Sequence, residues 1–506
     1  MLAKVISGAN VGLESIGVTV EVDIASQGLP SFTLVGLADR AVEESRERVR
    51  SALKNSGADF PAKRITVNLA PADLPKEGPA FDLPIAVGLL LASGQLEKDL
   101  SDTLLVGELS LDGSLRSTHG VLSFTLLTKS LGLKRIFVPK ENGVEAAVVE
   151  GIEVFAFDNL LQVFKFLIGS EEVFPQPLTD LNLINHVIFE YDFKDIKGQQ
   201  QARRALEIAA AGGHNVIMKG PPGAGKTLLA RAFPSILPSM SKEEALEVTK
   251  IYSVSGNLSS DQPIITSRPF RSPHHTASYV GMVGGGNNIK PGEVSLAHRG
   301  VLFLDELPEF PRQVLEALRQ PVEDRKVTIS RASGSLSFPS QFTLLCALNP
   351  CPCGFLGDPK KNCCCMPGQI SRYKKKVSGP LLDRIDIHLD VPAVEVEKLT
   401  GQETAEDSQA IKTRVEKARN IQQERFKGSG ILTNSEMSNA QIKTWCRITQ
   451  DALDLLKMAI SQMNLSARGY HRVLKLSRTI ADLASSENIL AEHVAEALTY
   501  RAREEN

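Results

Sequence analysis

A glycine-rich loop near the middle of the chain constrains the fold more than any other feature. The loop follows an apolar run at residues 215–219 and leads into a second apolar run at residues 228–233, so the order strand, loop, helix is predicted. Glycines let backbone N–H groups turn inward, and the positive end of the helix dipole adds to them, so this order forms a phosphate site. The residues of the loop are Gly220, Pro221, Pro222, Gly223, Ala224, Gly225, Lys226 and Thr227.

The last two residues of this loop have the chemistry that a bound nucleotide needs. Lys226 is expected to reach the β- and γ-phosphates of ATP, and the hydroxyl of Thr227 is expected to hold Mg²⁺. A Gly/Pro-rich turn with an incidental lysine is the alternative, and the flanking strand and helix argue against it. The loop therefore predicts an ATP-binding site.

A second apolar strand, residues 301–304, ends in two carboxylates, Asp305 and Glu306. Open α/β sheets bind their ligands at the carboxyl ends of the strands. Asp305 is predicted to lie in the Mg²⁺ shell, and Glu306 is predicted to orient and deprotonate the attacking water. A third strand, residues 342–348, ends in Asn349, whose neutral side chain suits positioning of that water. Together these residues predict a nucleotide hydrolase.

The composition of the whole chain limits the classes of partner. Its 506 residues are enough for about three domains, and 57 Lys and Arg against 59 Asp and Glu give a net charge of −2. Because no global positive charge draws the chain to nucleic acid, any such contact is expected to be local. The start of the chain lacks a signal-peptide pattern, and the longest apolar stretch, residues 83–93, is too short to span a bilayer. A cytoplasmic protein without membrane contact is expected.

Five of the seven cysteines fall within residues 351–365, as one C-x-C pair followed by another. In a reducing compartment this clustering argues for metal rather than for disulfides. Four thiolates around a Pro/Gly-rich turn suit a closed tetrahedral zinc site, with free thiols as the alternative. Cys364 is a spare thiol that can replace either neighbour. The predicted ligands are Cys351, Cys353, Cys363 and Cys365.

Residues 267–299 form the least regular part of the predicted motor. Glycine-rich loops between core strands act on a substrate or tolerate insertion. The paired His274 and His275 lack further ligands at useful spacing, so loop packing or phosphate contact is favoured over metal. DNA contact is predicted for the cations of this region, with solvated loop residues as the alternative. These cations are Arg268, Arg271 and Lys290.

Two arginines further along the chain are candidates for the nucleotide site. Arg384 follows a basic run at residues 372–376 and is placed to reach the nucleotide of a neighbouring subunit. A local surface pair between Asp383 and Arg384 is the alternative. The C-terminal part is helical, and Arg468 lies in the first turn of a helix that Ser466 caps. From there Arg468 is expected to face the γ-phosphate.

Residues 1–170 are predicted to form a mixed α/β domain. Apolar and polar residues alternate at 17–23 and 65–69, which is typical of half-buried strands. Three further segments resemble the proteolytic domain of Lon proteases, and this resemblance implies a ribosomal S5 domain 2-like fold. The segments are Leu74–Pro79, Val106–Gly113 and Val138–Asn142.

The residues that catalyse proteolysis in the Lon family have no match in this chain. The serine of that family falls at Ala80, and the later helix has no lysine before Lys129. Without a hydroxyl nucleophile and its amine base, proteolysis through a covalent intermediate cannot proceed. A retained fold with a lost active site is expected, and a rearranged dyad at Ser123 is the alternative.

Five motifs, at residues 220–227, 301–306, 349–354, 378–386 and 465–472, carry a second resemblance. Through them the chain is similar to the ComM/YifB family, in the magnesium-chelatase-like branch of the AAA+ ATPases. The resemblance implies that Asn349 is sensor 1, that Arg384 is an arginine finger and that Arg468 is sensor 2. It also implies a homo-hexameric ring that moves branched DNA when transforming DNA is integrated.

The resemblance and the composition together set the expected domain boundaries. A Lon-like domain is expected at 1–170, followed by a polar, proline-marked linker at 171–190. A P-loop AAA+ core is expected at 191–395 with a cysteine-rich insertion at 351–365, and a C-terminal helical lid at 396–506. The predicted fold class is therefore α/β with a helical lid.

Three hypotheses about function compete. The first is a DNA-translocating ATPase ring, a branch-migration helicase that acts on single-stranded or branched DNA. The second is a magnesium-chelatase-like subunit that remodels a protein partner, and the third is an ATP-dependent protease. Ala80 argues against the protease, and the fused Lon-like domain and the cysteine cluster weaken the chelatase hypothesis. The first two share the same motor, so the sequence favours the DNA motor without separating them fully.

Overall fold

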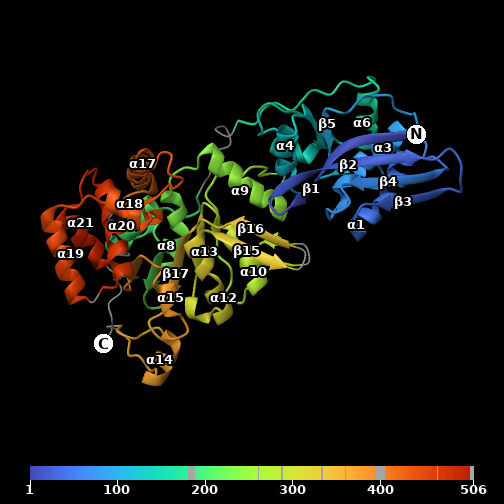
Figure 1. The fold of residues 1–506 in the computed structure, drawn as a ribbon. Coiled ribbons are helices and arrows are strands. Elements are labelled where there is room, and N and C mark those ends of the chain that lie inside the picture. The colour runs from blue at the N-terminus through green and yellow to red at the C-terminus, as the bar shows by residue number, and fades with distance from the viewer. Residues whose placement is uncertain are drawn as a thin grey trace. The chain divides into compact units, whose positions relative to one another are not determined.

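The computed structural model describes residues 1–180, 189–259, 261–286, 289–331, 334–358, 361–393, 405–463 and 465–501. Contacts divide the chain into two compact units, each built from segments that are far apart in sequence (Figure 1). The first unit comprises residues 1–186 and 242–266, and the second comprises residues 187–241 and 267–506. Residues 242–266, which were expected within the motor core, therefore belong to the first unit.

A seven-stranded sheet organises the first unit. Its strands are β1 (Leu2–Val11), β2 (Glu14–Ile24), β3 (Ser31–Val35), β4 (Arg64–Ala70), β5 (Thr103–Leu105), β8 (Arg135–Pro139) and β9 (Glu153–Phe157). The order is β3-β4-β2-β1-β5-β8-β9, antiparallel among β4, β2 and β1 and parallel elsewhere. The alternating segments 17–23 and 65–69 lie within β2 and β4, so both strand predictions are confirmed.

Helix α3 (Asp82–Ala92) lies in the core of the first unit because its sequence is apolar on every side. The side chains of Leu83 and Leu90 are almost completely buried. At its start, the buried Asp82 accepts two hydrogen bonds from Arg48, at 2.6 and 3.0 Å, yet burial raises the pKa of Asp82 to about 6. The longest apolar stretch is therefore a core helix. Within the described residues, no helix has both the length and the apolar character needed to cross a membrane.

The remaining helices of the first unit pack around this sheet. They include α2 (Ser45–Asn55), α4 (Val121–Ser130), α5 (Gly143–Ala146) and α6 (Leu160–Leu167). The alternative of a rearranged dyad at Ser123 gains no support, because Ser123 and Lys129 each donate to a backbone carbonyl. Ser123 donates to the carbonyl of Leu13 at 2.9 Å, and Lys129 donates to the carbonyl of Glu150 at 2.9 Å.

Helix α9 (Lys242–Ser255) follows the phosphate loop in sequence but packs against α4 of the first unit (Figure 1). The backbone N–H of Gly120 donates to the carbonyl of Ser253 at 3.2 Å. The buried carboxylate of Glu145 accepts hydrogen bonds from the Ser253 hydroxyl, from Leu122 N at 2.9 Å and from Asn142 Nδ2 at 3.0 Å. Burial raises the pKa of Glu145, and these three donors oppose the rise. A segment of the predicted motor thus completes the first unit.

A five-stranded parallel sheet organises the second unit. Its strands are β10 (Val216–Lys219), β11 (Phe270–Arg271), β14 (Val301–Leu304), β17 (Thr343–Leu348) and β18 (Ile387–Asp390). The order is β11-β14-β17-β10-β18, and Val216 of β10 pairs with Leu345 of β17 and Ile387 of β18. Because all five strands are parallel, their carboxyl ends meet at one edge of the sheet.

A helical bundle covers part of the second unit. It consists of α17 (Ser408–Arg425), α18 (Asn439–Trp445), α19 (Gln450–Gln462), α20 (Ala467–Leu483) and α21 (Ala491–Thr499). Helix α7 (Gln200–Gly212) packs against α17 and α20, so the bundle and the sheet share one hydrophobic core. Ser466 caps α20 by accepting from Gly469 N at 3.2 Å, as predicted.

We predict that Ser253→Ala loosens the contacts of α9 with α5 and α4 without disturbing the second unit. The substitution removes one of three donors to a buried carboxylate, which costs about 1–3 kcal/mol. Native-state hydrogen exchange in α4 and α9 is then expected to be roughly 5- to 150-fold faster, with α20 unchanged. Ser255→Ala is the matched control, since Ser255 donates only to the Tyr252 carbonyl on the same helix. Equal rates of amide hydrogen exchange in the two variants would contradict a stabilising role for the hydrogen bond between Ser253 and Glu145.

Candidate functional site

The phosphate loop joins β10 to helix α8 (Lys226–Ala232), as the sequence predicts. Gly223 and Gly225 have φ angles of +79° and +87°, which side chains rarely adopt. A Cβ atom on Gly220 would lie 2.1 Å from the carbonyl oxygen of Val391, so the loop also needs glycine for close packing. The backbone thus has the shape of a phosphate cradle at the start of a helix.

Lys226 connects the phosphate loop to the end of strand β17. Its ammonium donates to the carbonyls of Gly220 at 2.7 Å and Pro221 at 2.9 Å, and to Asn349 Oδ1 at 3.1 Å. Burial lowers the pKa of Lys226, and the nearby Asp305 and Glu306 oppose that shift. The structure therefore brings together the predicted lysine, both carboxylates and Asn349.

Asp305 and Thr227 form the part of the site that suits Mg²⁺. The Thr227 hydroxyl donates to Asp305 Oδ2 at 2.8 Å, and Asp305 Oδ1 accepts from the backbone N–H of Glu306 at 2.9 Å. A hydroxyl and a carboxylate side by side are hard oxygen ligands of the kind that Mg²⁺ uses together with substrate phosphates. The donor set fits the ion that the sequence analysis assigns to it.

Glu306 is less firmly held than the other site residues. Its backbone has φ +51°, and its side chain is 57% exposed. His275 Nδ1 lies 3.7 Å from Glu306 Oε2, and the His275 ring packs edge-on against Phe310. His274 instead contacts the Thr276 hydroxyl at 2.9 Å. The paired histidines therefore face a carboxylate and a hydroxyl.

Sequence reasoning missed the contact between His275 and Glu306. The signal that reveals it is strand register: Phe270 pairs with Val301 in parallel strands. His275 and Glu306 each lie five residues beyond that pair, so both reach the same edge of the sheet. Without the pairing of β11 and β14, nothing local connects the two residues.

The four predicted metal ligands converge in the second unit. The sulfur atoms of Cys351, Cys353, Cys363 and Cys365 lie within 4.8 Å of one another. Cys351 Sγ is 3.4 Å from Cys353 Sγ and 3.6 Å from Cys363 Sγ. Four sulfurs about 2.3 Å from one tetrahedral ion are about 3.8 Å apart, so the cluster is close to the size of a zinc site. Cys364 is exposed and lies outside the set, in line with its prediction as a spare.

Arg384 bonds within its own chain. Its guanidinium pairs with Glu323 of helix α13 (Arg319–Asp324) and donates to the carbonyl of Pro380 at 2.6 Å. The alternative of a pair with Asp383 is not what the structure shows, because Asp383 lies 3.8 Å from Arg472.

Arg468 is exposed in the first turn of α20. Arg472, one turn later on the same helix, donates to the carbonyl of Ile385 at 3.0 Å. Residues four apart share a helix face, so the start of α20 presents Arg468 on the side that contacts the segment after Arg384.

Two of the three cations predicted to contact DNA are held by other groups. Arg268 donates to the carbonyls of Pro238 at 2.6 Å and Arg299 at 2.8 Å. Arg271 forms a two-bond ion pair with Glu293 at 2.6 and 2.7 Å. These contacts tie the loop to its neighbours, and the DNA contact of the two arginines stays a prediction. Lys290 is exposed, on the short strand β13 (Lys290–Pro291).

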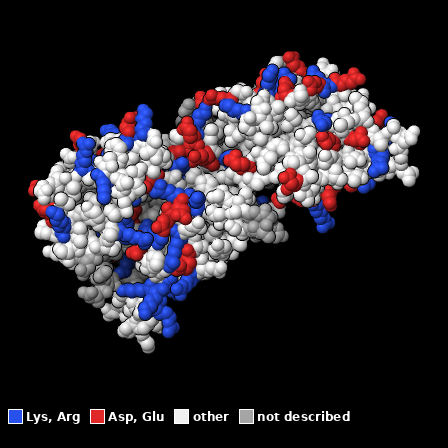
Figure 2. All heavy atoms as spheres, in the orientation of Figure 1, with Lys and Arg blue, Asp and Glu red and all other residues white. Residues whose placement is uncertain are grey.

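A basic surface follows the cysteine cluster. Figure 2 shows Lys and Arg side chains gathered at the lower end of the molecule, where Figure 1 places helix α14 (Pro367–Lys374). We call this surface the α14 patch. Its exposed cations are Arg372, Lys374, Lys375 and Lys376, of which Lys376 pairs with Glu309 at 3.0 Å.

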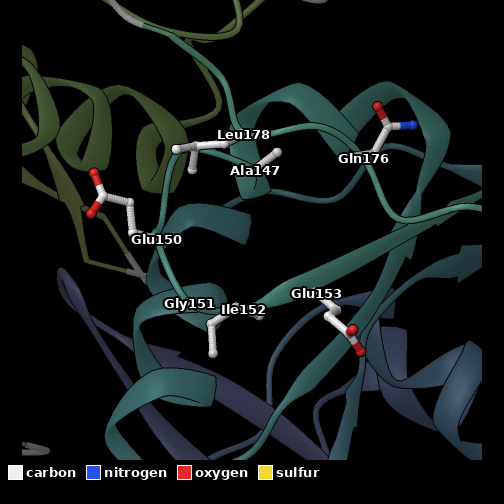
Figure 3. Close-up of a pocket in the computed structure, with 7 residues that line it drawn as sticks. All are labelled: Ala147, Glu150, Gly151, Ile152, Glu153, Gln176 and Leu178. Atoms are coloured by element: carbon white, nitrogen blue, oxygen red, sulfur yellow. The ribbon is translucent and has the colours of Figure 1, made fainter.

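A separate hollow lies in the first unit, between the start of β9 and residues 176–178 (Figure 3). It is lined by Ala147, Glu150, Gly151, Ile152, Glu153, Gln176 and Leu178. Figure 3 shows that the carboxylates of Glu150 and Glu153 lie on different sides of the hollow and do not point toward one another. Its polar groups do not converge, so the hollow lacks the arrangement of an active site.

Three family models match the chain. They are "Magnesium chelatase, subunit ChlI" over residues 192–399, "Subunit ChlI of Mg-chelatase" over residues 20–142 and "Magnesium chelatase, subunit ChlI C-terminal" over residues 405–501. The last two fall in the Lon-like region and in the helical bundle. The similarity to the magnesium chelatase subunit therefore extends along most of the chain.

Similar proteins agree with these matches. The chain is 45% identical to Competence protein ComM of Haemophilus influenzae over 510 residues, covering 99% of this chain and 97% of that protein. It is 44% identical to Uncharacterized protein YifB of Escherichia coli over 504 residues, with the same two coverages. Lon protease 2 of Bacillus subtilis is 33% identical over 150 residues, or 28% of this chain and 26% of that protein. The chain therefore belongs to the ComM/YifB family of magnesium-chelatase-like AAA+ proteins, and this membership implies ATPase activity with ATP and Mg²⁺.

Proposed function

We propose that this chain is an ATP-driven ring motor that moves branched DNA, in natural transformation or a related recombination process. The observation that carries the motor is the convergence of Lys226, Thr227, Asp305 and Asn349 at one edge of the parallel sheet. Support for DNA comes from the exposed cations of the same unit and from a relative that is named a competence protein. The proposed location is the cytoplasm.

Each site residue has a role in this proposal. Lys226 turns from the loop carbonyls to the β- and γ-phosphates, while Thr227 and Asp305 hold Mg²⁺ between them. Glu306 orients the attacking water and accepts its proton, and Asn349 holds that water through its amide. Because Asn349 also accepts from Lys226, phosphate binding and water positioning share one group.

We predict that Lys226→Ala and Glu306→Gln fail at different steps. Lys226→Ala removes a charge that contacts phosphate and weakens nucleotide binding. Glu306→Gln keeps the size of the side chain but not its basicity, so it leaves binding intact and lowers turnover by about two orders of magnitude or more. Equilibrium binding of a fluorescent ADP analogue and steady-state ATPase rates separate the two effects.

The matched control is Glu309→Gln, which neutralises a nearby carboxylate that pairs with Lys376. Its turnover is expected to stay close to that of the unaltered protein. Near-normal hydrolysis by Glu306→Gln would remove Glu306 from the proposal.

We propose a ring because the hydrogen bonds of Arg384 go to residues outside the phosphate loop of its own chain. Its partners within the chain are Glu323 and Pro380. An arginine that stabilises the transferring phosphoryl group is often supplied by a neighbour. We propose that Arg384 exchanges Glu323 for the nucleotide of the adjacent subunit in a hexamer, and that Arg468 approaches the γ-phosphate from the start of α20.

We predict that mixing Arg384→Ala with Lys226→Ala protein restores part of the ATPase activity. A mixed ring contains some sites in which an intact Lys226 faces an intact Arg384 across the subunit boundary. Mixing Lys226→Ala with Glu306→Gln is the control, because both residues belong to the same half of the site and no intact site can form. Activity is measured after the subunits exchange. Full activity of a monomer would exclude the composite site.

DNA binding is proposed for Lys290 and the α14 patch. In a ring every subunit repeats the same cations, so a few charges per chain form a charged channel although the net charge is −2. Contacts of this kind release counterions from phosphates, which makes binding weaken steeply with salt and depend little on sequence. Arg372 and Lys375 contribute exposed cations from the α14 patch, and Lys290 contributes one from β13.

We predict that Lys290→Ala and the double variant Arg372→Ala/Lys375→Ala each weaken DNA binding. The slope of log affinity against log salt should fall by about one for each phosphate contact removed. Fluorescence anisotropy with branched and single-stranded DNA measures the slope. Lys443→Ala, which removes an exposed lysine on α18, is the control.

The family models support a second candidate function, the remodelling of a protein partner by a magnesium-chelatase-like motor. The same experiment separates the two. If purified protein at low salt neither binds DNA nor hydrolyses ATP faster in its presence, partner remodelling becomes the better proposal.

We also propose that Zn²⁺ occupies the four-cysteine cluster. The four sulfurs are close to the tetrahedral spacing, and four cysteine sulfurs are a ligand set that structural zinc sites use. Zinc would supply the bonds that close the loop. Elemental analysis of protein purified without chelator is expected to find about one Zn²⁺ per chain.

A further inference from the structure

The segment between β17 and α14 joins the nucleotide site to the α14 patch. Asn349, which accepts from Lys226, is followed two residues later by Cys351, the buried ligand of the cluster. At the other end, Cys365 is followed two residues later by Pro367, where α14 begins. A metal held by the four cysteines therefore fixes both ends of the segment at once.

Two contacts tie this segment to the nucleotide site in addition to the chain itself. Gly354 has φ +84°, and a Cβ atom there would lie 2.5 Å from Cδ of Pro222, so the segment rests directly on the phosphate loop. The backbone N–H of Asn349 donates toward the hydroxyl oxygen of Tyr373 on α14. The cluster thus borders the phosphate loop on one side and the end of β17 on the other.

The segment has only a small buried core of its own. Between β17 and α14, the described residues 349–358 and 361–366 form no helix or strand. The buried residues among them are Pro350, Cys351 and Gly354, which provide a small apolar core. The free energy of metal binding can stabilise the folded form of a segment that has so small a core.

We propose that the four-cysteine site is a positioning site for ATP hydrolysis. Metal bound there holds Asn349 and Pro222 in place for the nucleotide, and it seats α14 beside them. The inference rests on the proposed zinc site and on the proposed role of Asn349. It requires that changes in the segment reduce nucleotide binding and turnover while the rest of the motor stays folded.

A pair of glycine variants tests the contact with the metal ligands left intact. Gly354 and Gly357 have similar φ angles, +84° and +78°, so alanine strains the backbone at both. Only Gly354 meets Pro222, since nothing lies within 4 Å of a Cβ on Gly357. Gly354→Ala is expected to keep its zinc and to lose about 10- to 100-fold in turnover, with weaker binding of a fluorescent ADP analogue. Equal turnover and ADP binding in the two variants would overturn the proposal.

Cysteine variants test the metal itself. Cys353→Ser is expected to lose both zinc and turnover, about 10- to 100-fold for the latter. Cys364→Ser, which alters the thiol outside the set, keeps both. Cys353→His restores zinc and part of the turnover, because imidazole is also a zinc ligand. Far-UV circular dichroism and the fluorescence of Trp445, the one tryptophan, report whether each variant is folded.

The outcomes separate the inference from the proposals beneath it. If the unaltered protein contains no zinc, the zinc site fails and the inference fails with it. If Cys353→Ser loses zinc but keeps its ADP affinity and turnover, the zinc site stands and the positioning role is refuted. If Cys353→Ser does not fold, the Gly354 and Gly357 pair decides, because both variants keep all four thiols.

Discussion

The hydrogen bonds of one ammonium group connect the parts of the second unit that matter for function. Lys226 bonds two carbonyls of the phosphate loop and the side chain of Asn349, so it ties β10 to the end of β17. This arrangement requires the parallel order in which β17 lies next to β10. The cysteine cluster, two residues beyond Asn349, then takes its position from the same strand end. The ammonium is buried, so these bonds are strong enough to define the geometry of the loop.

The first unit depends on a polar contact between two parts of the chain that lie far apart in sequence. The unit buries Glu145 against Ser253 of α9, a helix that the sequence predicts inside the motor. Removing residues 1–186 would take Glu145 away and leave the buried hydroxyl of Ser253 without this acceptor, which is costly. The first unit is therefore a structural partner of a motor segment.

The sequence was sufficient where local pattern and sheet rules determine the outcome. The order strand, loop, helix and the placement of Asp305 and Asn349 at one sheet edge follow from apolar runs and parallel pairing, and the structure has both. Contacts between residues far apart in the sequence could not be predicted from it. The assignment of α9 to the first unit depends on a contact between residues 108 positions apart, and the partners of Arg268 depend on how its loop folds back. Neither leaves a periodic or spacing signal.

The two halves of the nucleotide site are held by different forces. Lys226 is buried and makes three hydrogen bonds, whereas Glu306 is 57% exposed and its Oε2 atom lies 3.7 Å from Nδ1 of His275. An exposed pair at that distance contributes at most about 1 kcal/mol, so solvent and neighbouring groups can reorient the carboxylate easily. The phosphate cradle is thus preorganised, while the Glu306 carboxylate is free to respond to its surroundings. A site built in this way can bind nucleotide before it is competent to hydrolyse it, which is what a motor with separate binding and power steps requires.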